Sequence, residues 1–360
     1  MRLFFAGDIS PTRVTSPLFK EKDLDTLFTD TKTLFEENDY NIVNLECALT
    51  ESDGAIAKIG PAIKAPVETA QVLKALGVHY CNLSNNHTFD YGVQGIEDTI
   101  RAIKDCGMEY TGFGNNYEDS RRDCILTKNG EKVAIIAVCE HEYTYALDDR
   151  MGARPYDEYD TPEDIRRAKK ENDHVIVIYH GGKEYCPYPS PRLRKLCRAM
   201  VKNGADAVLC QHSHCIGCYE EYEGGHILYG QGNFHFVTPS KRECWLSGLA
   251  VKYDTVSHKI EFVPLNMLEK GIETAKGERA KKIMGEFEKR NLQLQNGQWK
   301  KGWEEFCASV SEGYRKCMEQ AFAKEASESD KQMFPHYFDC EAHSDVLREI
   351  YKTYNHTNCK

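Results

Sequence analysis

Residues that bind metals recur in short segments of this sequence, and each segment follows an apolar stretch. The histidines of these segments are His87, His180, His212 and His214, and the carboxylates are Asp8 and Glu46. Imidazole, carboxylate and amide oxygen are the ligands that divalent transition metals take in proteins. The pattern therefore indicates metal chemistry at the ends of several strands.

The segment Gln211-His212-Ser213-His214 carries two imidazoles in one short stretch. Residues i and i+2 of an extended chain point to the same side, so both rings can face one site. A polar loop is the alternative interpretation of this motif by itself. The apolar run at 207–210 directly before it favours a strand end. His180-Gly181-Gly182 repeats the arrangement, with glycines that allow a close approach.

Glu46 and Asn86 offer oxygen ligands. Glu46 ends the run that begins at Asn41, where an unpaired carboxylate is costly to bury but well placed to bridge two cations. Asn86 presents an amide oxygen beside His87, whose imidazole need not touch a metal. Asn86-His87-Thr88 also matches the N-glycosylation acceptor pattern, for which a cytoplasmic chain has no use.

Alternating strands and helices are expected to position these segments. Apolar spacing predicts strands at 3–6, 41–45, 79–83, 109–111, 174–179, 207–210, 217–222, 227–229, 249–253 and 259–263, and helices at 23–38, 66–76, 95–106, 162–172 and 191–203. A turn at 128–131 predicts a hairpin over 124–139. In α/β proteins, ligands bind where the carboxyl ends of strands meet at one sheet edge, so we expect the segments to converge there.

The element order predicts an α/β fold, a four-layer α/β/β/α sandwich of two mixed β-sheets with a C-terminal helical extension. We expect the metal-binding domain to span residues 1–270 and the extension to span 271–360. From about residue 273 the chain becomes rich in charged, helix-forming residues, which predicts three or four helices. Their regularly spaced aromatic residues indicate packing against the main domain, and a lid over the site is the alternative.

Composition excludes some partners. The net charge of −10 argues against a nucleic-acid surface, and no apolar run is long enough to span a membrane. The apolar stretch before Asp8 is too short for a signal peptide and predicts a buried strand. The 15 cysteines lie singly inside apolar runs, which is typical of free thiols in a reducing cytoplasm. We therefore expect a cytoplasmic protein, and the oligomeric state stays open.

The order of these segments resembles the calcineurin-like metallophosphoesterase superfamily, and more closely the bacterial capsule-synthesis CapA family associated with poly-γ-glutamate. The matching segments are 7–8, 44–46, 64–66, 84–92, 180–185, 204–206, 211–214 and 227–234. The resemblance covers about residues 1–265, and eight ordered motifs make it specific. The helical tail lies outside it.

The resemblance implies a site with two divalent cations, of manganese, iron or zinc. One cation would be held by Asp8 and His214, the other by Asn86, His180 and His212, and Glu46 would bridge them. Ser10 stands where the superfamily pattern has a histidine, so one ion or two remain alternatives. Glu46 also replaces the usual bridging aspartate, and Gln211 replaces the glycine before His-x-His.

The resemblance further implies His87 and Asp90 as catalytic residues, with His87 protonating the leaving group. Candidate substrate contacts are Lys64, Asn85, Lys183 and Glu184, and for the charged residues a solvated surface position is the alternative. The expected function is a CapA-like metal-dependent hydrolase that activates water against a phosphoester or a γ-glutamyl amide, in a small molecule or a polyanionic polymer. The alternative is a non-catalytic metal-binding partner in capsule polymer synthesis or export.

Overall fold

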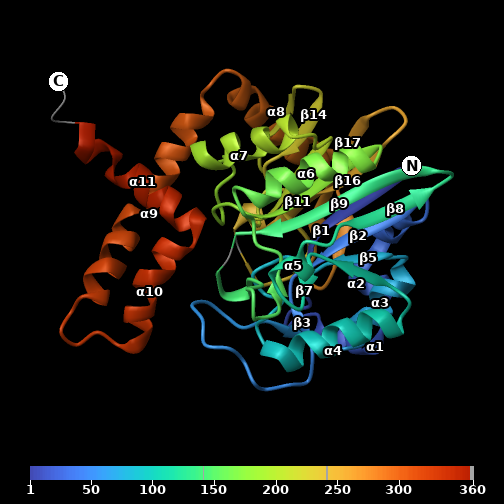
Figure 1. Cartoon of the computed structure of the whole chain (residues 1–360), viewed down its shortest axis with the longest axis horizontal. Coiled ribbons are helices and arrows are strands. Elements are labelled where there is room, and N and C mark those ends of the chain that lie inside the picture. Colours follow the sequence, from blue (N-terminus) through green and yellow to red (C-terminus); the bar gives the residue numbers. More distant parts are fainter. Residues whose placement is uncertain (141, 241, 357–360) are drawn as a thin grey trace.

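Two mixed β-sheets lie face to face at the centre of the protein, as the computed structural model of residues 1–140, 142–240 and 242–356 describes it (Figure 1). The larger sheet runs in the order β18 (Ile272–Thr274), β17 (Lys259–Met267), β16 (Ser247–Asp254), β1 (Arg2–Ile9), β2 (Tyr40–Leu45), β5 (Tyr80–Asn82) and β6 (Glu109–Thr111), and β15 (Asn233–His235) pairs with β1. The second sheet runs in the order β13 (Tyr219–Tyr222), β14 (Gly225–Leu228), β12 (Ala207–His212), β11 (His174–Gly181), β9 (Glu131–Cys139) and β8 (Cys124–Lys128).

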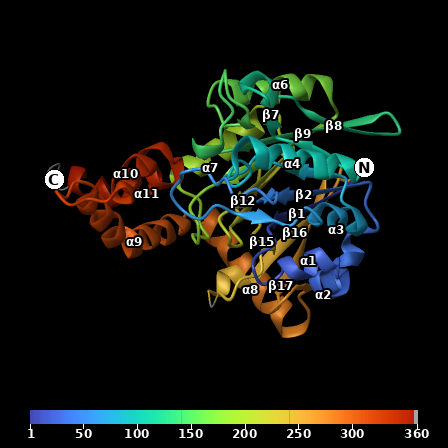
Figure 2. The same ribbon diagram turned by 90° about the horizontal axis from the view of Figure 1, so that it is seen from below.

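Helices cover the outer faces of both sheets (Figures 1 and 2). The larger sheet is covered by α1 (Ser16–Glu21), α2 (Leu24–Phe28), α3 (Thr69–Leu76) and α4 (Gly92–Asp105), and the second sheet by α6 (Asp160–Glu171) and α7 (Pro191–Lys202). Two short strand pairs join β3 (Ala48–Leu49) to β4 (Lys64–Ala65) and β7 (Phe113–Gly114) to β10 (Gly152–Ala153), and α5 (Tyr117–Ser120) is a single turn. The predicted four-layer α/β/β/α sandwich is therefore confirmed.

The side chains of β1 show why its sequence is continuously apolar. Leu3 and Phe5 pack between the two sheets, whereas Phe4 and Ala6 pack under the helices of the outer layer. Successive residues of a strand point to opposite faces, so a strand buried on both faces needs apolar residues at every position. The same burial on both faces holds for β9, β11 and β12.

Most predicted elements are found within a few residues of their expected positions, and the hairpin of β8 and β9 is confirmed. The predicted helix over 23–38 is wrong in its second half. There α2 ends at Phe28 and a 3₁₀ helix, Thr29–Phe35, follows. Thr29 has a φ of 37°, a left-handed conformation that interrupts an α-helix, and its hydroxyl donates a hydrogen bond to the carbonyl of Ile272 at 2.5 Å.

The C-terminal helices are α8 (Gly277–Gln295), α9 (Trp299–Ala321), α10 (Glu328–Asp339) and α11 (Glu341–His356). Ile283 and Phe287 of α8 pack into the core between the sheets, and β18 adds a strand to the larger sheet. By contrast, α9, α10 and α11 project from the side of the sandwich opposite the N-terminus (Figure 1). The division of the chain after residue 270 stays a prediction. Across the described residues, every helix is too short or too polar to cross a bilayer.

His235 of β15 makes the fold sensitive to acid. Its ring lies between Phe19 and Phe28, with centroids at 5.2 and 5.0 Å, and burial lowers its pKa to about 4. Because an unfolded histidine titrates near 6.5, the unfolded chain binds more protons between about pH 6.5 and pH 4. The stabilisation is therefore present above pH 6.5 and is lost as the pH falls toward 4.

We expect the free energy of unfolding of the wild-type protein to drop between pH 7 and pH 5 by about 2 kcal/mol more than that of His235→Leu. Urea unfolding of both proteins at the two pH values measures this difference. Leucine retains the apolar contacts and cannot be protonated. Equal losses in the two proteins would contradict the assignment.

Candidate metal centre

The carboxyl ends of two pairs of parallel strands, one pair in each sheet, bring the predicted ligands together. Asp8 lies near the end of β1, Glu46 directly follows β2, and His180 and His212 lie at the ends of β11 and β12. β1 pairs parallel with β2, and β11 with β12, so each pair of strands ends at the same edge of its sheet. All these side chains are buried. The convergence predicted from the sequence is therefore present.

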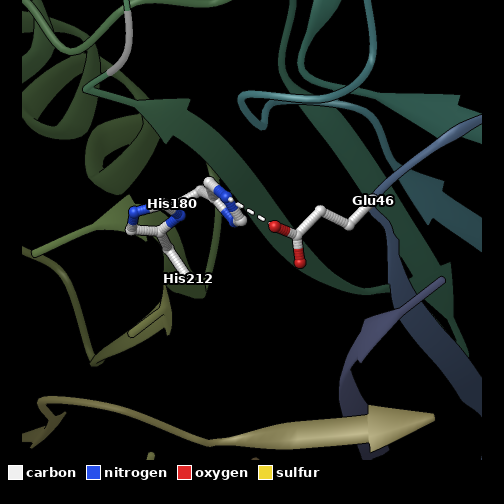
Figure 3. Close-up of side chains that lie close together, drawn as sticks. All are labelled: Glu46, His180 and His212. Carbon is white, nitrogen blue, oxygen red and sulfur yellow. Dashed lines mark ion pairs between the residues drawn. The ribbon is translucent and has the colours of Figure 1, made fainter. Parts of the chain in front are cut away.

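Glu46, His180 and His212 form the first group of ligands (Figure 3). One potential ligand atom from each lies within 4.8 Å of the others, and His180 Nε2 is 3.6 Å from Glu46 Oε1. Asn86 joins this group, because its Oδ1 lies 2.9 Å from His180 Nε2. Two imidazoles, a carboxylate and an amide oxygen make a donor set suited to manganese, iron or zinc.

Asp8, Glu46 and His214 form a second group, again with ligand atoms within 4.8 Å of one another. The backbone N–H of His212 donates to Asp8 Oδ2 at 3.1 Å, and His214 Nδ1 lies 2.8 Å from Asn233 Oδ1. Glu46 belongs to both groups, and the residues sort into the sets that the sequence resemblance implies. Glu46 thus lies where a ligand shared by both groups would have to lie.

The charge state of Glu46 supports this interpretation. Its two carboxylate oxygens are buried, and neither has a hydrogen-bond partner in the described part of the chain. Burial, Asp8 and Glu184 together raise the pKa of Glu46 well above its usual value. Burial also raises the pKa of Asp8, against the opposing effects of His214 and Asn44. Crowded, buried acids of this kind are costly unless cations neutralise them, so the residues fit a pair of divalent ions.

The backbone around the two histidines is strained. His212 has a φ of 85° and His214 a φ of 54°, values that residues with a side chain rarely adopt. Tyr185 donates its N–H to the carbonyl of Ser213 at 2.8 Å, and this bond helps to hold the loop. Strain of about 1–3 kcal/mol per residue persists only where the surroundings impose it, and it is concentrated at functional sites.

His87 and Asp90 form a hydrogen-bonded pair beside the metal groups. His87 Nδ1 lies 2.7 Å from Asp90 Oδ2, and Lys58 Nζ donates to Asp90 Oδ1 at 2.6 Å. Lys58 also donates to the carbonyl of Asn86 at 2.8 Å. Burial and Lys58 lower the pKa of His87, while Asp90 raises it. Lys58 was missed from the sequence, since it stands in a loop without any motif.

A chain of amides positions the ligands, and its central member, Asn44, was also missed. Asn44 Nδ2 donates to Asp8 Oδ1 at 2.7 Å and lies 3.1 Å from His180 Nδ1. Asn85, predicted as a substrate contact, donates to Asn44 Oδ1 at 3.1 Å and to the carbonyl of Leu45 at 2.9 Å. Asn85 is fully buried, and its contacts are those of a positioning residue. Asn44 lies in the matching segment 44–46, but no role was predicted for it from the sequence.

The other predicted substrate contacts separate into two sets. Lys183 and Glu184 line a pocket of about 310 Å³ together with Asn86, His87 and His212. Lys64 lies outside this lining, where it donates to the carbonyl of Ser52 at 2.7 Å and to Asp53 at 2.8 Å. Ser10 is fully buried at the end of β1 and supplies no imidazole to the second group.

A third cluster, His174, Asp206 and His258, lies at the opposite end of β11 from His180. Both oxygens of Asp206 already accept hydrogen bonds from Lys169, at 2.9 and 2.8 Å. Asp206 also accepts the N–H of Val175 at 2.7 Å. Because the carboxylate of Asp206 is engaged in this way, it forms a structural ion pair with Lys169. The cluster is separate from the candidate centre.

Known proteins with related sequences include capsule proteins. Capsule biosynthesis protein CapA of Bacillus anthracis is 31% identical over 281 residues, which cover 75% of this chain and 68% of that protein. PGA biosynthesis protein CapA of Bacillus subtilis (strain 168) is 31% identical over 236 residues, 64% of this chain and 62% of the relative. Among solved structures, a 5'-nucleotidase from Candida albicans SC5314 aligns with a TM-score of 0.44 and 10% identity, covering 98% of this chain and 58% of that one. A likeness this weak carries no argument about function.

A family model described as bacterial capsule synthesis protein PGA_cap matches residues 2–238. The matched region contains both groups of candidate ligands together with His87 and Asp90. It ends before α8 begins, so the helical tail is not part of the match. The match covers more than half of the chain and agrees with the curated relatives, and the chain therefore belongs to the bacterial capsule synthesis protein family, PGA_cap.

Proposed function

We propose that this protein is a metal-dependent hydrolase that cleaves a γ-glutamyl amide or a phosphoester in poly-γ-glutamate capsule metabolism. The observation that carries the proposal is Glu46, a buried carboxylate shared by two ligand groups and without a hydrogen-bond partner among the described residues. Divalent cations held there would supply an activated water and would polarise the bond that is cleaved.

The protein residues would divide the remaining tasks. Asp8 and His214 would hold one ion, and His180, His212 and Asn86 the other. His87 would protonate the leaving group, and its bond to Asp90 would orient the imidazole. Lys58 would hold Asp90 and the backbone of Asn86 in place. The names of the curated relatives support the link to capsule polymer, and the many singly placed cysteines support a cytoplasmic location.

The experiment that tests this proposal begins with protein stripped by a chelator. We expect no hydrolysis of γ-glutamyl p-nitroanilide or p-nitrophenyl phosphate by the stripped protein. Adding manganese, ferrous iron or zinc should restore binding of up to two ions, measured by elemental analysis, and cleavage of one of the two substrates. Which substrate is cleaved identifies the bond that the enzyme attacks.

Two other outcomes would redirect the assignment. Tight metal binding without turnover of either substrate would favour a non-catalytic partner in capsule synthesis or export, and the name of the B. subtilis relative refers to PGA biosynthesis. Failure to bind any of the three metals would contradict the proposal altogether, because the crowded acids of the centre would then need another explanation.

A further inference from the structure

The pocket over the candidate metal centre has a wall from outside the family domain. Asn86, His87 and His212 line the side of the 310 Å³ pocket that faces the ligands. Another wall is built by α10 and α11, through Met333, His336, Tyr337, Cys340, Ala342 and His343. Both helices follow residue 238, where the family match ends. The tail therefore completes a pocket whose metal-binding part belongs to the family fold.

Polar contacts fix this wall to the metal-binding loops. Asp345 of α11 accepts hydrogen bonds from Ser190 at 2.6 Å and from Arg192 at 2.9 Å. Arg192 also donates to Glu140 at 2.8 Å, and Glu140 accepts the N–H of Gly182, two residues after His180. An arginine shared by two carboxylates is a directional link, because its donors lie in a rigid plane. The wall is thus tied to the segment that carries a candidate ligand.

An apolar cluster adds to this docking. Its members are Cys186, Trp303, Cys307, Tyr314, Tyr337, Val346 and Leu347. Cys186 belongs to the loop after His180, and the others belong to α9, α10 and α11. Trp303 is among the largest fully buried side chains of the protein. Burial of this extent places the wall at a defined position over the pocket.

Six lysines and histidines line the pocket against a single carboxylate, although the whole chain has a net charge of −10. The basic residues are Lys58, His87, Lys183, His212, His336 and His343, and they face the acid Glu184. The rings of His336 and His343 lie 4.8 Å apart, and His343 Nδ1 lies 2.6 Å from the hydroxyl of Tyr314. Lys58 is paired with Asp90, and His212 is a candidate metal ligand. His336 and His343 are the imidazoles that the tail adds to the pocket, and imidazole N–H groups can hydrogen-bond an anion.

We propose that His336 and His343 recognise an anionic group of the substrate at a distance from the bond that is cleaved. This inference rests on the proposed function and names its substrate class: a small molecule, or the end of a chain, that carries a second carboxylate or phosphate. A volume of 310 Å³ is at the lower end of small-molecule sites, which span about 300–1,000 Å³. The part of a ligand that this volume encloses is therefore about one terminal unit.

Pairs of probes that differ only in the distant anion test the proposal. The carboxylate pair is γ-glutamyl-glutamate and γ-glutamyl-glutamine, and the phosphate pair is glycerol 1,3-bisphosphate and glycerol 1-phosphate. Titration calorimetry with the metal-loaded protein measures the affinity gained from the distant anion. We expect a gain of fivefold or more in one pair, its loss in His336→Glu, and its retention in His336→Lys. The pair that shows the gain identifies the anion.

Gln320→Glu is the matched control, since Gln320 is exposed on α9 of the same tail and outside the pocket lining. It adds the same charge and should leave the gain unchanged. Equal gains in His336→Glu and the wild type, or no gain in either pair, would overturn the inference even if the enzyme is active. A charge-dependent gain in a protein that cleaves neither test substrate would sustain the inference while contradicting the proposed function. The opposite effects of glutamate and lysine separate recognition from a loss of folding.

Discussion

Glu46→Gln is expected to lower kcat/KM by about 10³-fold or more and to reduce metal binding. Removal of one donor that stabilises an oxyanion already costs about 10²–10³-fold, and a carboxylate shared by two cations contributes to both. Glutamine has nearly the same shape, but its neutral amide cannot bridge two ions. Elemental analysis of the loaded variant, together with kcat/KM on the substrate that the wild type cleaves, measures both effects.

The same substitution should change stability in the opposite direction when metal is absent. Burial, Asp8 and Glu184 disfavour the charged form of Glu46, so a neutral amide should raise the unfolding temperature of the stripped protein. Added metal should then raise the unfolding temperature of the wild type much more than that of the variant, because only the wild type binds tightly. A variant that is more stable without metal but gains less stability when metal is added is expected only if Glu46 is a metal ligand.

Glu220→Gln is the matched control for Glu46→Gln. Glu220 is also buried, but Arg198 donates to its Oε1 at 2.9 Å and the Tyr229 hydroxyl does so at 2.7 Å. We expect this control to lose stability and to keep its metal. If Glu46→Gln binds the same number of ions as the wild type and turns over at the same rate, the bridging assignment is wrong.

His87→Asn is expected to keep the metal ions and to lower kcat by about 10²–10⁴-fold, the range of general acid–base catalysis. His87 lines the pocket, and its Nδ1 is held by Asp90, so Nε2 is the atom available to a leaving group. The loss should be largest for substrates with poor leaving groups, which need protonation most. Rates for a series of aryl phosphates or γ-glutamyl anilides measure this dependence.

Asp90→Asn separates positioning from proton transfer. Asp90 accepts hydrogen bonds from Lys58 and from the N–H of Ile63 at 2.7 Å, so it orients His87 without lining the pocket. We expect a smaller loss of rate with the same metal content. A His87→Asn loss that is equal for good and poor leaving groups would contradict the acid role and would point to a purely structural one.

Much of this site could be predicted from local patterns. Asp8, Glu46, His180 and His212 each end a continuous apolar run, and such runs form strands buried on both faces. Parallel strands end at one edge, so the convergence follows from the element order. The His-x-His spacing also placed His214 near His212, and the structure assigns the two rings to different ligand groups.

Other features depend on contacts that no local pattern reveals. Lys58 meets Asp90 across 32 residues of sequence, and Asn44 meets His180 across 136 residues. A lysine in a loop and an asparagine inside a strand look the same whether or not they touch a site. The α2 helix likewise stops at Thr29, where the chain turns to meet β18, although its apolar spacing predicts a longer helix.

Residue type and spacing were thus sufficient for the layered sheets, the ligand-bearing strand ends and the family, because each strand end depends on a pattern of about ten neighbouring residues and the layers and the family depend on the order of such patterns along the chain. Packing in three dimensions was needed to reveal the contacts of Asn44, the lysine beside His87 and Asp90, and the contacts of the tail. Regular aromatic spacing shows that a helix is buried, but not what it covers. Only the docking of α11 on Ser190 and Arg192 brings His336 and His343 to the pocket.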